Sequence, residues 1–374
     1  MASRDAQAET CPQLRLQCPP REGMRSPDRR ISGKHSVCVR SFRLASREVY
    51  QLTDAFSSEV QNRVGAIASF AVTAKLSCET MKTCVILNPI AGAVKDIDSI
   101  RERLNTLHPT RLCISEKPGE VENLARESVE AGFEQIVSAG GDGTLNEVVN
   151  GIATANAAIR LAVVPLGTGN DFARTLGVPI DIDEAIEHIL RGQIREIDLV
   201  RVTSDLVRYF ANVSSGGFSG LVDEKLTPEM KKNWGPLAYL RSAAAAFPQL
   251  RGYTTRVTLD DREALELDLY NVIVANGRYV AGGIPVAPEA EIADGLIDVI
   301  LIPERGKTDL VLLAAQILVG KHLTSDAIIF HRAKKIGIRS KPGMWFNVDG
   351  ELIGNEPATF ELLPKALRCI VPAT

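Results

Sequence analysis

The 374-residue chain lacks the long apolar run that a membrane-spanning helix requires. Such a helix needs about 20 consecutive, mainly apolar residues. The two most apolar stretches, Leu237–Phe247 and Leu310–Val319, are shorter than this. Arg241 interrupts the first stretch and Gln316 the second. We therefore expect helices that pack on other parts of the protein and no transmembrane segment.

An excess of charge of either sign is also missing. The chain carries 43 Lys and Arg against 46 Asp and Glu, a net charge of −3, which argues against nucleic-acid binding through a broad basic surface. Its seven cysteines are odd in number, irregularly spaced and without a CxxC pair, as expected for free thiols in a reducing compartment. Hydrophobic residues make up 45%, enough for two domains of ordinary size.

Residues 1–80 begin with a Pro- and Arg-rich stretch and show little apolar periodicity until about residue 49. Three interpretations stay open: a disordered extension with a helix near 48–76, an Arg-rich targeting segment, or residues added by an upstream start codon. The acidic residues count against targeting. We favour the first or the third, because Met81 leads directly into the strand-like run Cys84–Leu87. Residues 1–80 are thus predicted to be dispensable.

Short apolar runs alternate with amphipathic stretches after residue 80. The expected buried strands are Cys84–Leu87, Arg111–Ile114, Gln135–Ala139 and Leu161–Val164. The expected helices are Ile97–Leu107, Val121–Ala131, Leu145–Ile152 and Ile182–Leu190. This alternation predicts an α/β domain with a mostly parallel sheet over residues 81–203, and such sheets bind ligands at the carboxyl ends of their strands.

The pattern changes at about residue 200, where apolar and polar residues alternate within single runs. Expected strands are Leu199–Val202, Arg208–Val213, Thr255–Leu259, Glu266–Asn276, Gly295–Leu301, Lys335–Arg339 and Met344–Val348. We predict a mainly antiparallel, β-sandwich-like domain over residues 204–374, with helical insertions near 228–249 and 306–320. The last strand-like pieces, Ala358–Leu363 and Ala366–Val371, can return to the first domain, so residues 355–374 are assigned to either.

The strongest local signal is the segment Val137–Asn146. A strand predicted to end at Ala139 runs into three closely spaced glycines, and a helix is expected to open at Thr144. Glycines let backbone N–H groups approach a phosphate closely, and a helix start adds free N–H groups and partial positive charge. Asp142 would repel a phosphate, but it can orient a magnesium-water shell or support the loop. A plain strand-to-helix turn capped by Asp is the alternative.

A second glycine-rich segment, Val164–Arg174, also joins a strand to a helix start. Its polar side chains Thr168, Asn170 and Asp171 suit a nucleotide and a metal better than a structural turn. Neither the GxxxxGK[ST] nor the GxGxxG pattern of common nucleotide-binding loops occurs.

Three further segments have simpler explanations when each is taken alone. Leu87–Gly92 and Ala281–Asp298 are turn-like, and a hairpin turn accounts for Asp349 and its following glycine. Glu351 stands beside that turn, where a carboxylate can face a cleft and act as a general base.

Taken in order, GGDGTLNEV, PLGTGNDFAR, APEA…DGLIDV and VDGE resemble the diacylglycerol kinase catalytic family, specifically its soluble bacterial lipid kinases. Sphingosine and ceramide kinases are more distant relatives. The resemblance extends from Met81 to the C-terminus. GGDGT alone also resembles NAD kinases and phosphofructokinases, whereas the ordered set is much more specific.

The resemblance implies a role for each matching residue. Glu351 would be the general base, Asp142 the essential acid of the phosphate loop, and Asp171 would organise a catalytic magnesium. The implied nucleotide-binding residues are Asn88, Ser115, Gly141, Asp142, Gly143, Thr144, Leu145, Asn146, Glu147 and Thr168. A structural magnesium would take the Asp294 carboxylate and the backbone carbonyls of Glu291 and Leu296. The chain departs from the family at Ser219, where relatives commonly have Asp.

These expectations describe an ATP- and Mg²⁺-dependent lipid kinase that is cytoplasmic, peripheral at the membrane, and free of nucleic-acid partners. The lipid would enter between the two domains. A soluble-metabolite kinase related to NAD kinases and a non-catalytic nucleotide- or lipid-binding regulator remain alternatives. The sequence leaves open which lipid is used, the preferred nucleotide donor, the role of residues 1–80 and the oligomeric state, with a homodimer as one alternative.

Overall fold

The structure, a computed structural model, describes residues 81–92, 94–155, 158–219, 242, 250–260, 262–355 and 357–373. Residues 1–80 and most of the helical insertion expected near 228–249 lie outside this part of the chain. Cys84, Cys113 and Cys369 are buried free thiols, as expected, and the other four cysteines are outside the described residues.

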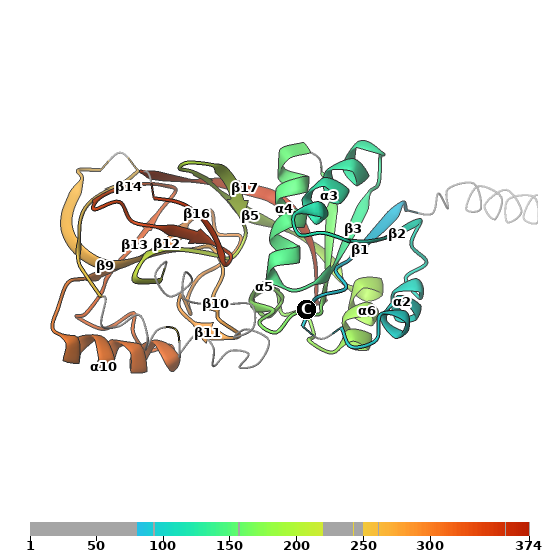
Figure 1. Cartoon of the computed structure of the whole chain (residues 1–374), viewed down its shortest axis with the longest axis horizontal. Coiled ribbons are helices and arrows are strands. Elements are labelled where there is room, and N and C mark those ends of the chain that lie inside the picture. The colour runs from blue at the N-terminus through green and yellow to red at the C-terminus, as the bar shows by residue number, and fades with distance from the viewer. Residues whose placement is uncertain are drawn as a thin grey trace, which may run out of the picture. The chain divides into compact units, whose positions relative to one another are not determined.

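The first half of the described chain alternates strands and helices (Figure 1). Its strands are β1 (Thr83–Leu87), β2 (Arg111–Ile114), β3 (Gln135–Gly140) and β4 (Arg160–Pro165). Its helices are α2 (Ile97–Asn105), α3 (Glu120–Glu130), α4 (Asp142–Ala155), α5 (Asp171–Leu176) and α6 (Ile182–Arg191). The four strands pair in parallel in the order β4-β3-β1-β2. The predicted parallel α/β sheet is confirmed.

The expected start of α4 at Thr144 was wrong. The helix begins two residues earlier, at Asp142, because the N–H of Leu145 already bonds the carbonyl of Gly141 at 3.0 Å. Asp142 therefore stands in the first helical turn.

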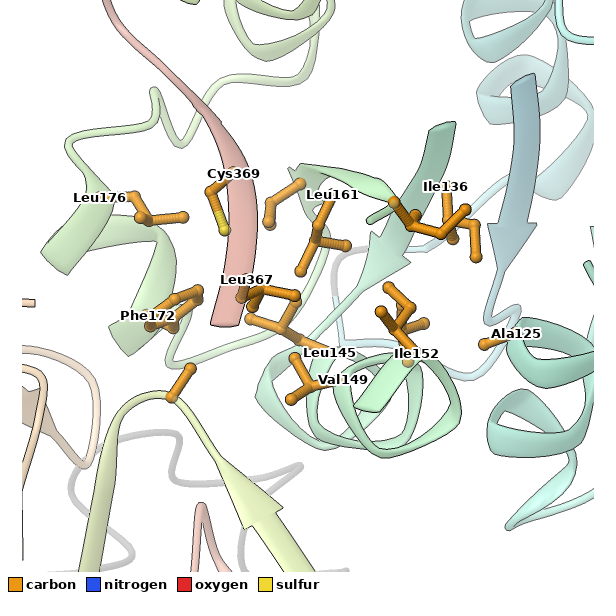
Figure 2. Packing of buried hydrophobic residues seen from close by; sticks show 14 of the residues in the cluster. Ala125, Ile136, Leu145, Val149, Ile152, Leu161, Phe172, Leu176, Leu367 and Cys369 are labelled. Carbon is orange, nitrogen blue, oxygen red and sulfur yellow. The ribbon is translucent and has the colours of Figure 1, made fainter. Parts of the chain in front are cut away.

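The parallel strands are covered on both faces, as their continuous apolar runs require. Successive residues of β3 point to opposite faces, so Ile136 and Val137 enter different apolar clusters. Figure 2 shows one cluster, in which Leu145 of α4 and Phe172 of α5 gather with Leu367 and Cys369 from the C-terminal strand. The end of the chain thus completes the core of its first half.

The second half is mainly antiparallel. Its strands are β5 (Gln193–Thr203), β6 (Val207–Phe210), β7 (Val213–Gly217), β8 (Tyr253–Leu259), β9 (Leu265–Ala275), β10 (Tyr279–Val280), β11 (Ile284–Pro285), β12 (Ile297–Pro303), β13 (Ile329–Ala333), β14 (Lys335–Lys341), β15 (Phe346–Val348), β16 (Glu351–Gly354) and β17 (Ala358–Val371). Helix α10 (Lys307–Leu318) follows β12. The predicted fold class, with its β-sandwich-like second part, is confirmed. Among the helices that the structure describes, none has the length and apolarity to cross a bilayer.

Two strand predictions failed because contacts with residues distant in the sequence decide the outcome. The expected single strand Arg208–Val213 is divided into β6 and β7, because the carbonyl of Asn212 turns to accept N–H groups from Asn276 and Gly277. The sequence also missed β13, whose His and Arg hide its strand pattern, although it pairs with β12 over five residues.

Strand β17 joins both halves into one sheet. It pairs with β14 near its start, lies parallel to β4 at Arg368 and Cys369, and runs antiparallel to β5 over most of its length. The two expected C-terminal pieces are one strand, with a register irregularity between Leu363 and Leu367. A boundary between residues 203 and 204 stays a prediction, because the sheet is continuous through β5 and β17.

The two glycine-rich loops touch each other at Gly141 and Gly167. A Cβ atom on Gly167 would lie 2.5 Å from the Cα of Gly141 and 2.8 Å from Oδ1 of Asn170. These positions exclude any side chain, and the contact holds the carboxyl ends of β3 and β4 together.

We predict that Gly167→Ala lowers the free energy of unfolding by about 1–3 kcal/mol, because backbone atoms must move to admit the methyl group. Gly143→Ala is the matched control, since nothing lies within 4 Å of its added Cβ and the position is helical. Urea unfolding of both variants is the measurement. Equal stability of Gly167→Ala and Gly143→Ala would contradict the close contact.

Candidate active site

A cavity of about 500 Å³ opens at the carboxyl ends of β3 and β4. The first half contributes Asp142, Gly143, Leu145, Thr168, Gly169, Asp171 and Phe172 to its lining. The second half contributes Asn212, Val213, Ser215, Ser219, Asn271, Ile273, Val280, Ala281, Gly282, Val286, Asn347, Asp349, Gly350 and Glu351. The three predicted catalytic residues, which are far apart in the sequence, therefore share one cavity.

Backbone amides hold two of the acids in place. Oδ1 of Asp142 accepts the N–H of Phe172 at 3.3 Å, which ties the β3–α4 loop to the start of α5. Asp171 accepts N–H groups from Gly282 at 3.0 Å and Gly283 at 2.7 Å. The loop that provides these amides has positive φ at Ala281 and both glycines, so it turns successive N–H groups toward one carboxylate.

Asp142 and Asp171 also border the same small space. A Cβ on Gly169 would lie 2.8 Å from Oδ2 of Asp142 and 3.2 Å from Oδ2 of Asp171. A side chain at this position would occupy the gap between the two carboxylates, which explains the glycine. Carboxylate oxygens are the ligands that Mg²⁺ prefers, so these two residues fit a magnesium ion that is also held by phosphate oxygens.

Negative charge is crowded in this cavity. Burial raises the pKa of Asp142, and it raises the pKa of Asp171 to about 6, although amides from Gly282 and Gly283 oppose the change. Burial likewise raises the pKa of Asp349 to about 7, against hydrogen bonds from Val213 and Asn146. The charge of Asp142 raises the pKa of both other acids. A bound cation would relieve this repulsion.

Asp349 is the site residue that sequence reasoning explained only as part of a turn. Asp349 and Gly350 have φ values of 45° and 89° and connect β15 to β16, with Val348 opposite Glu351. This is the two-residue hairpin that Asp-Gly predicts. The Asp349 carboxylate also accepts the Val213 N–H at 2.9 Å and the Asn146 amide at 3.2 Å. Because Asp-Gly is common in hairpins, no local signal distinguishes this aspartate.

The hairpin presents the exposed Glu351 to the cavity from the second half of the chain. The hydrogen bond from Asn146 of α4 to Asp349 of the hairpin fixes the position of the Glu351 carboxylate relative to the β3–α4 loop. The predicted nucleotide residue Asn146 thus holds the hairpin.

Most of the other predicted nucleotide-binding residues lie near the carboxyl ends of the parallel strands, whereas one contacts a neighbouring helix. Asn88 donates to Oγ1 of Thr144 at 2.8 Å, which joins the end of β1 to the first turn of α4. Thr168 stands beside Gly92, whose added Cβ would lie 2.6 Å from its hydroxyl. Ser115 is buried at the end of β2. Glu147 accepts the Val121 N–H at 3.0 Å, at the start of α3.

The predicted structural metal ligands lie on the loop before β12. Oδ1 of Asp294 accepts the Leu296 N–H at 3.0 Å, and Oδ2 lies 3.8 Å from a nitrogen of Arg332. The carbonyl of Glu291 accepts a hydrogen bond from the Asp294 N–H at 3.4 Å. One carboxylate and two carbonyls suit Mg²⁺ chemically. The Arg332 guanidinium would compete with the metal ion for the Asp294 carboxylate. Within the described residues, no group of three acidic, His or Cys side chains is arranged to hold a metal.

Family models and curated proteins match this chain over both of its halves. A family model described as the diacylglycerol kinase catalytic domain matches residues 82–202. A second, the YegS C-terminal NAD kinase beta sandwich-like domain, matches residues 211–371. A protein named diacylglycerol kinase from Staphylococcus saprophyticus subsp. saprophyticus is 31% identical over 77% of this chain and 94% of its own length. This chain belongs to the diacylglycerol kinase catalytic-domain family. The resemblance predicted from the motifs is confirmed.

Other members of this kinase family give the same result. A diacylglycerol kinase of Bacillus subtilis (strain 168) is 32% identical over 68% of this chain and 83% of its own length. The crystal structure of a candidate diacylglycerol kinase from Bacillus anthracis str. Sterne superposes with a TM-score of 0.67 at 25% identity. That match covers 79% of this chain and 98% of the other.

The raised pKa of Asp349 predicts a pH-dependent stability. Between its ordinary value of 3.8 and about 7, the folded protein holds a proton that the unfolded chain has lost. This aspartate therefore lowers the free energy of unfolding progressively as the pH rises through that window. In metal-free buffer, the melting temperature of Asp349→Asn minus that of the wild type should increase from pH 5 to pH 8. A flat difference, or one that decreases, would contradict the buried-acid assignment.

Proposed function

We propose that this protein is an ATP-dependent lipid kinase that transfers a phosphoryl group to a hydroxyl of a diacylglycerol-like lipid at the membrane surface. One observation carries the proposal: Asp142, from a glycine-rich strand end, and Glu351, from a distant hairpin, line the same cavity. Phosphoryl transfer needs a polyphosphate cradle and an acceptor-activating group on opposite sides of one space.

The β3–α4 and β4–α5 loops are the proposed polyphosphate cradle. Gly141 and Gly167 keep their backbones in contact, and the first turn of α4 offers N–H groups that no preceding residue of the helix can bond. Thr168 adds a hydroxyl from the cavity wall. Mg²⁺, held by Asp142 and Asp171, would neutralise phosphate charge. The amides of Gly282 and Gly283 keep Asp171 oriented for this role.

The opposite wall is the proposed acceptor site. Its polar side chains are mostly uncharged amides and hydroxyls: Asn212, Ser215, Ser219, Asn271 and Asn347. Such groups suit a neutral, hydroxyl-bearing head group. Ser219 donates to Oδ1 of Asn271 at 2.9 Å, so the departure from the family's Asp leaves an uncharged hydrogen-bonded pair.

The proposed reaction is an in-line displacement. The lipid hydroxyl oxygen bonds to the γ-phosphorus of ATP as the bond from that phosphorus to the β–γ bridging oxygen breaks. ADP leaves with the bond electrons, and Glu351 takes the hydroxyl proton. Asp349 and Asn146 position Glu351 through the hairpin.

We predict that Glu351→Gln reduces kcat by about 10²–10⁴-fold, the usual effect of losing a positioned base, and leaves nucleotide affinity unchanged. Asp142→Ala should abolish transfer. Glu263→Gln, an exposed acid in the loop between β8 and β9, is the matched control and should retain full activity. Labelled-ATP turnover and nucleotide titration measure these effects. Near-normal turnover by Glu351→Gln would reject its role as the base.

The acceptor class is tested with a substrate panel. Diacylglycerol, phosphatidylglycerol, sphingosine and NAD are each offered with labelled ATP and Mg²⁺. We expect label in a neutral glycerolipid. The second matching family model is described by its likeness to an NAD kinase sandwich, which makes a soluble-metabolite kinase the competing function. Label in NAD alone would favour that function, and absence of transfer to all four would favour a non-catalytic regulator.

A further inference from the structure

Helix α10 exposes an unusual amount of apolar surface. Val311, Leu312, Leu318 and its C-terminal flanking residue Val319 are 63%, 62%, 50% and 65% exposed. In Figure 1, α10 lies at the edge of the second half, well apart from the helices of the first half.

The exposed residues form one continuous face. An α-helix turns about 100° per residue, so Val311, Ala315 and Leu318 line up along it, with Leu312 and Val319 beside them. Leu313 points the opposite way and is buried, with Leu310 and Ile317 packed around the same cluster. The helix is thus apolar on its outer face as well as on the inner one, unlike an ordinary surface helix.

The inner face of α10 is connected to the wall of the cavity. The helix packs on β11, and its inner residue Leu313 belongs to the same apolar cluster as Val280 and Val286, which line the cavity. After the helix, the buried ring of His322 bonds the carbonyl of Val286 at 2.7 Å. A surface that binds the outer face of α10 is therefore separated from the cavity wall by about one helix diameter, roughly 10 Å.

Basic residues flank this face. Exposed Arg305 precedes the helix and exposed Lys321 follows it. Helices that lie in a membrane interface bury an apolar face while basic side chains reach the lipid phosphates.

A second copy of the chain is a poorer occupant. Twelve helical residues extend about 18 Å, and a face about 10 Å wide offers roughly 200 Å². A stable protein interface needs about 800 Å² from each partner. A bilayer has no such minimum, because its area is unlimited and shallow insertion suffices.

We infer that the outer face of α10 inserts into an anionic lipid bilayer and thereby brings the cavity to the membrane surface, where the acceptor lipid resides. This inference rests on the proposed lipid-kinase function for its purpose. The binding itself needs neither nucleotide nor catalysis.

The experiment measures flotation of the full chain with vesicles of phosphatidylglycerol and phosphatidylcholine, and with phosphatidylcholine alone, without nucleotide. Val311→Gln/Leu318→Gln should weaken binding to the anionic vesicles by about tenfold or more, because two inserted apolar side chains become polar. Leu312→Gln/Val319→Gln provides an independent pair on the same face. The matched control is Leu206→Gln/Val207→Gln, which alters two exposed apolar residues elsewhere.

Arg305→Gln/Lys321→Gln should weaken binding to the anionic vesicles and leave binding to phosphatidylcholine unchanged. Equal binding by the wild type and both α10 pairs, or absence of wild-type binding to either vesicle, would overturn the inference. A wild-type dimer that the α10 pairs dissociate in sedimentation would also overturn it, in favour of a second copy. Turnover with a dispersed short-chain acceptor separates membrane docking by α10 from the proposed kinase function. α10 variants that lose vesicle binding but keep this turnover support membrane docking. A wild-type protein that binds vesicles but lacks this turnover refutes the proposed function and leaves membrane docking standing.

Discussion

The antiparallel ladder between β5 and β17 is the interaction on which the rest of the structure depends. Both strands are long enough to run from the β-rich half into the parallel sheet, where β17 pairs with β4 at Arg368 and Cys369. Backbone hydrogen bonds therefore set the position of one half against the other. Together with the hydrogen bond from Asn146 to Asp349, this ladder fixes the strand end before Asp142 relative to the hairpin that carries Glu351.

A second level of order comes from acids that are held by backbone amides. Asp171 accepts two amides from the loop after β10, Asp142 accepts one from α5, and Asp349 accepts one from β7. These bonds oppose the rise in the pKa of each acid that burial causes. The same carboxylates thus connect loops from both halves and concentrate negative charge where a metal and a polyphosphate would bind. Holding these buried carboxylates with backbone amides therefore both fixes their positions and keeps their mutually repelling charges close together.

Much of the parallel sheet was predictable because its strands are short, mainly apolar runs, and because β3 and β4 lead into glycines. The glycine-rich loops followed from the same pattern. The second half was harder, because short strands depend on pairing more than on composition. The sequence of β13 gives little strand signal, and its neighbour β12 supplies the partner. Division of the expected strand at Asn212 likewise depends on distant backbone groups.

The sequence by itself determined the family, the α/β order of the first half, and the identity of Asp142, Asp171 and Glu351 as candidates, because glycine and acid spacings are local features. Only the tertiary structure decided which of these residues share a space. It brought Asp349 into the cavity, turned Glu147 toward α3, and left the outer face of α10 exposed within the described part of the chain. The Asp349 contacts join residues more than a hundred positions apart, the Glu147 contact spans 26 positions, and the exposure of α10 depends on what packs against it. Local residue patterns encode none of these outcomes.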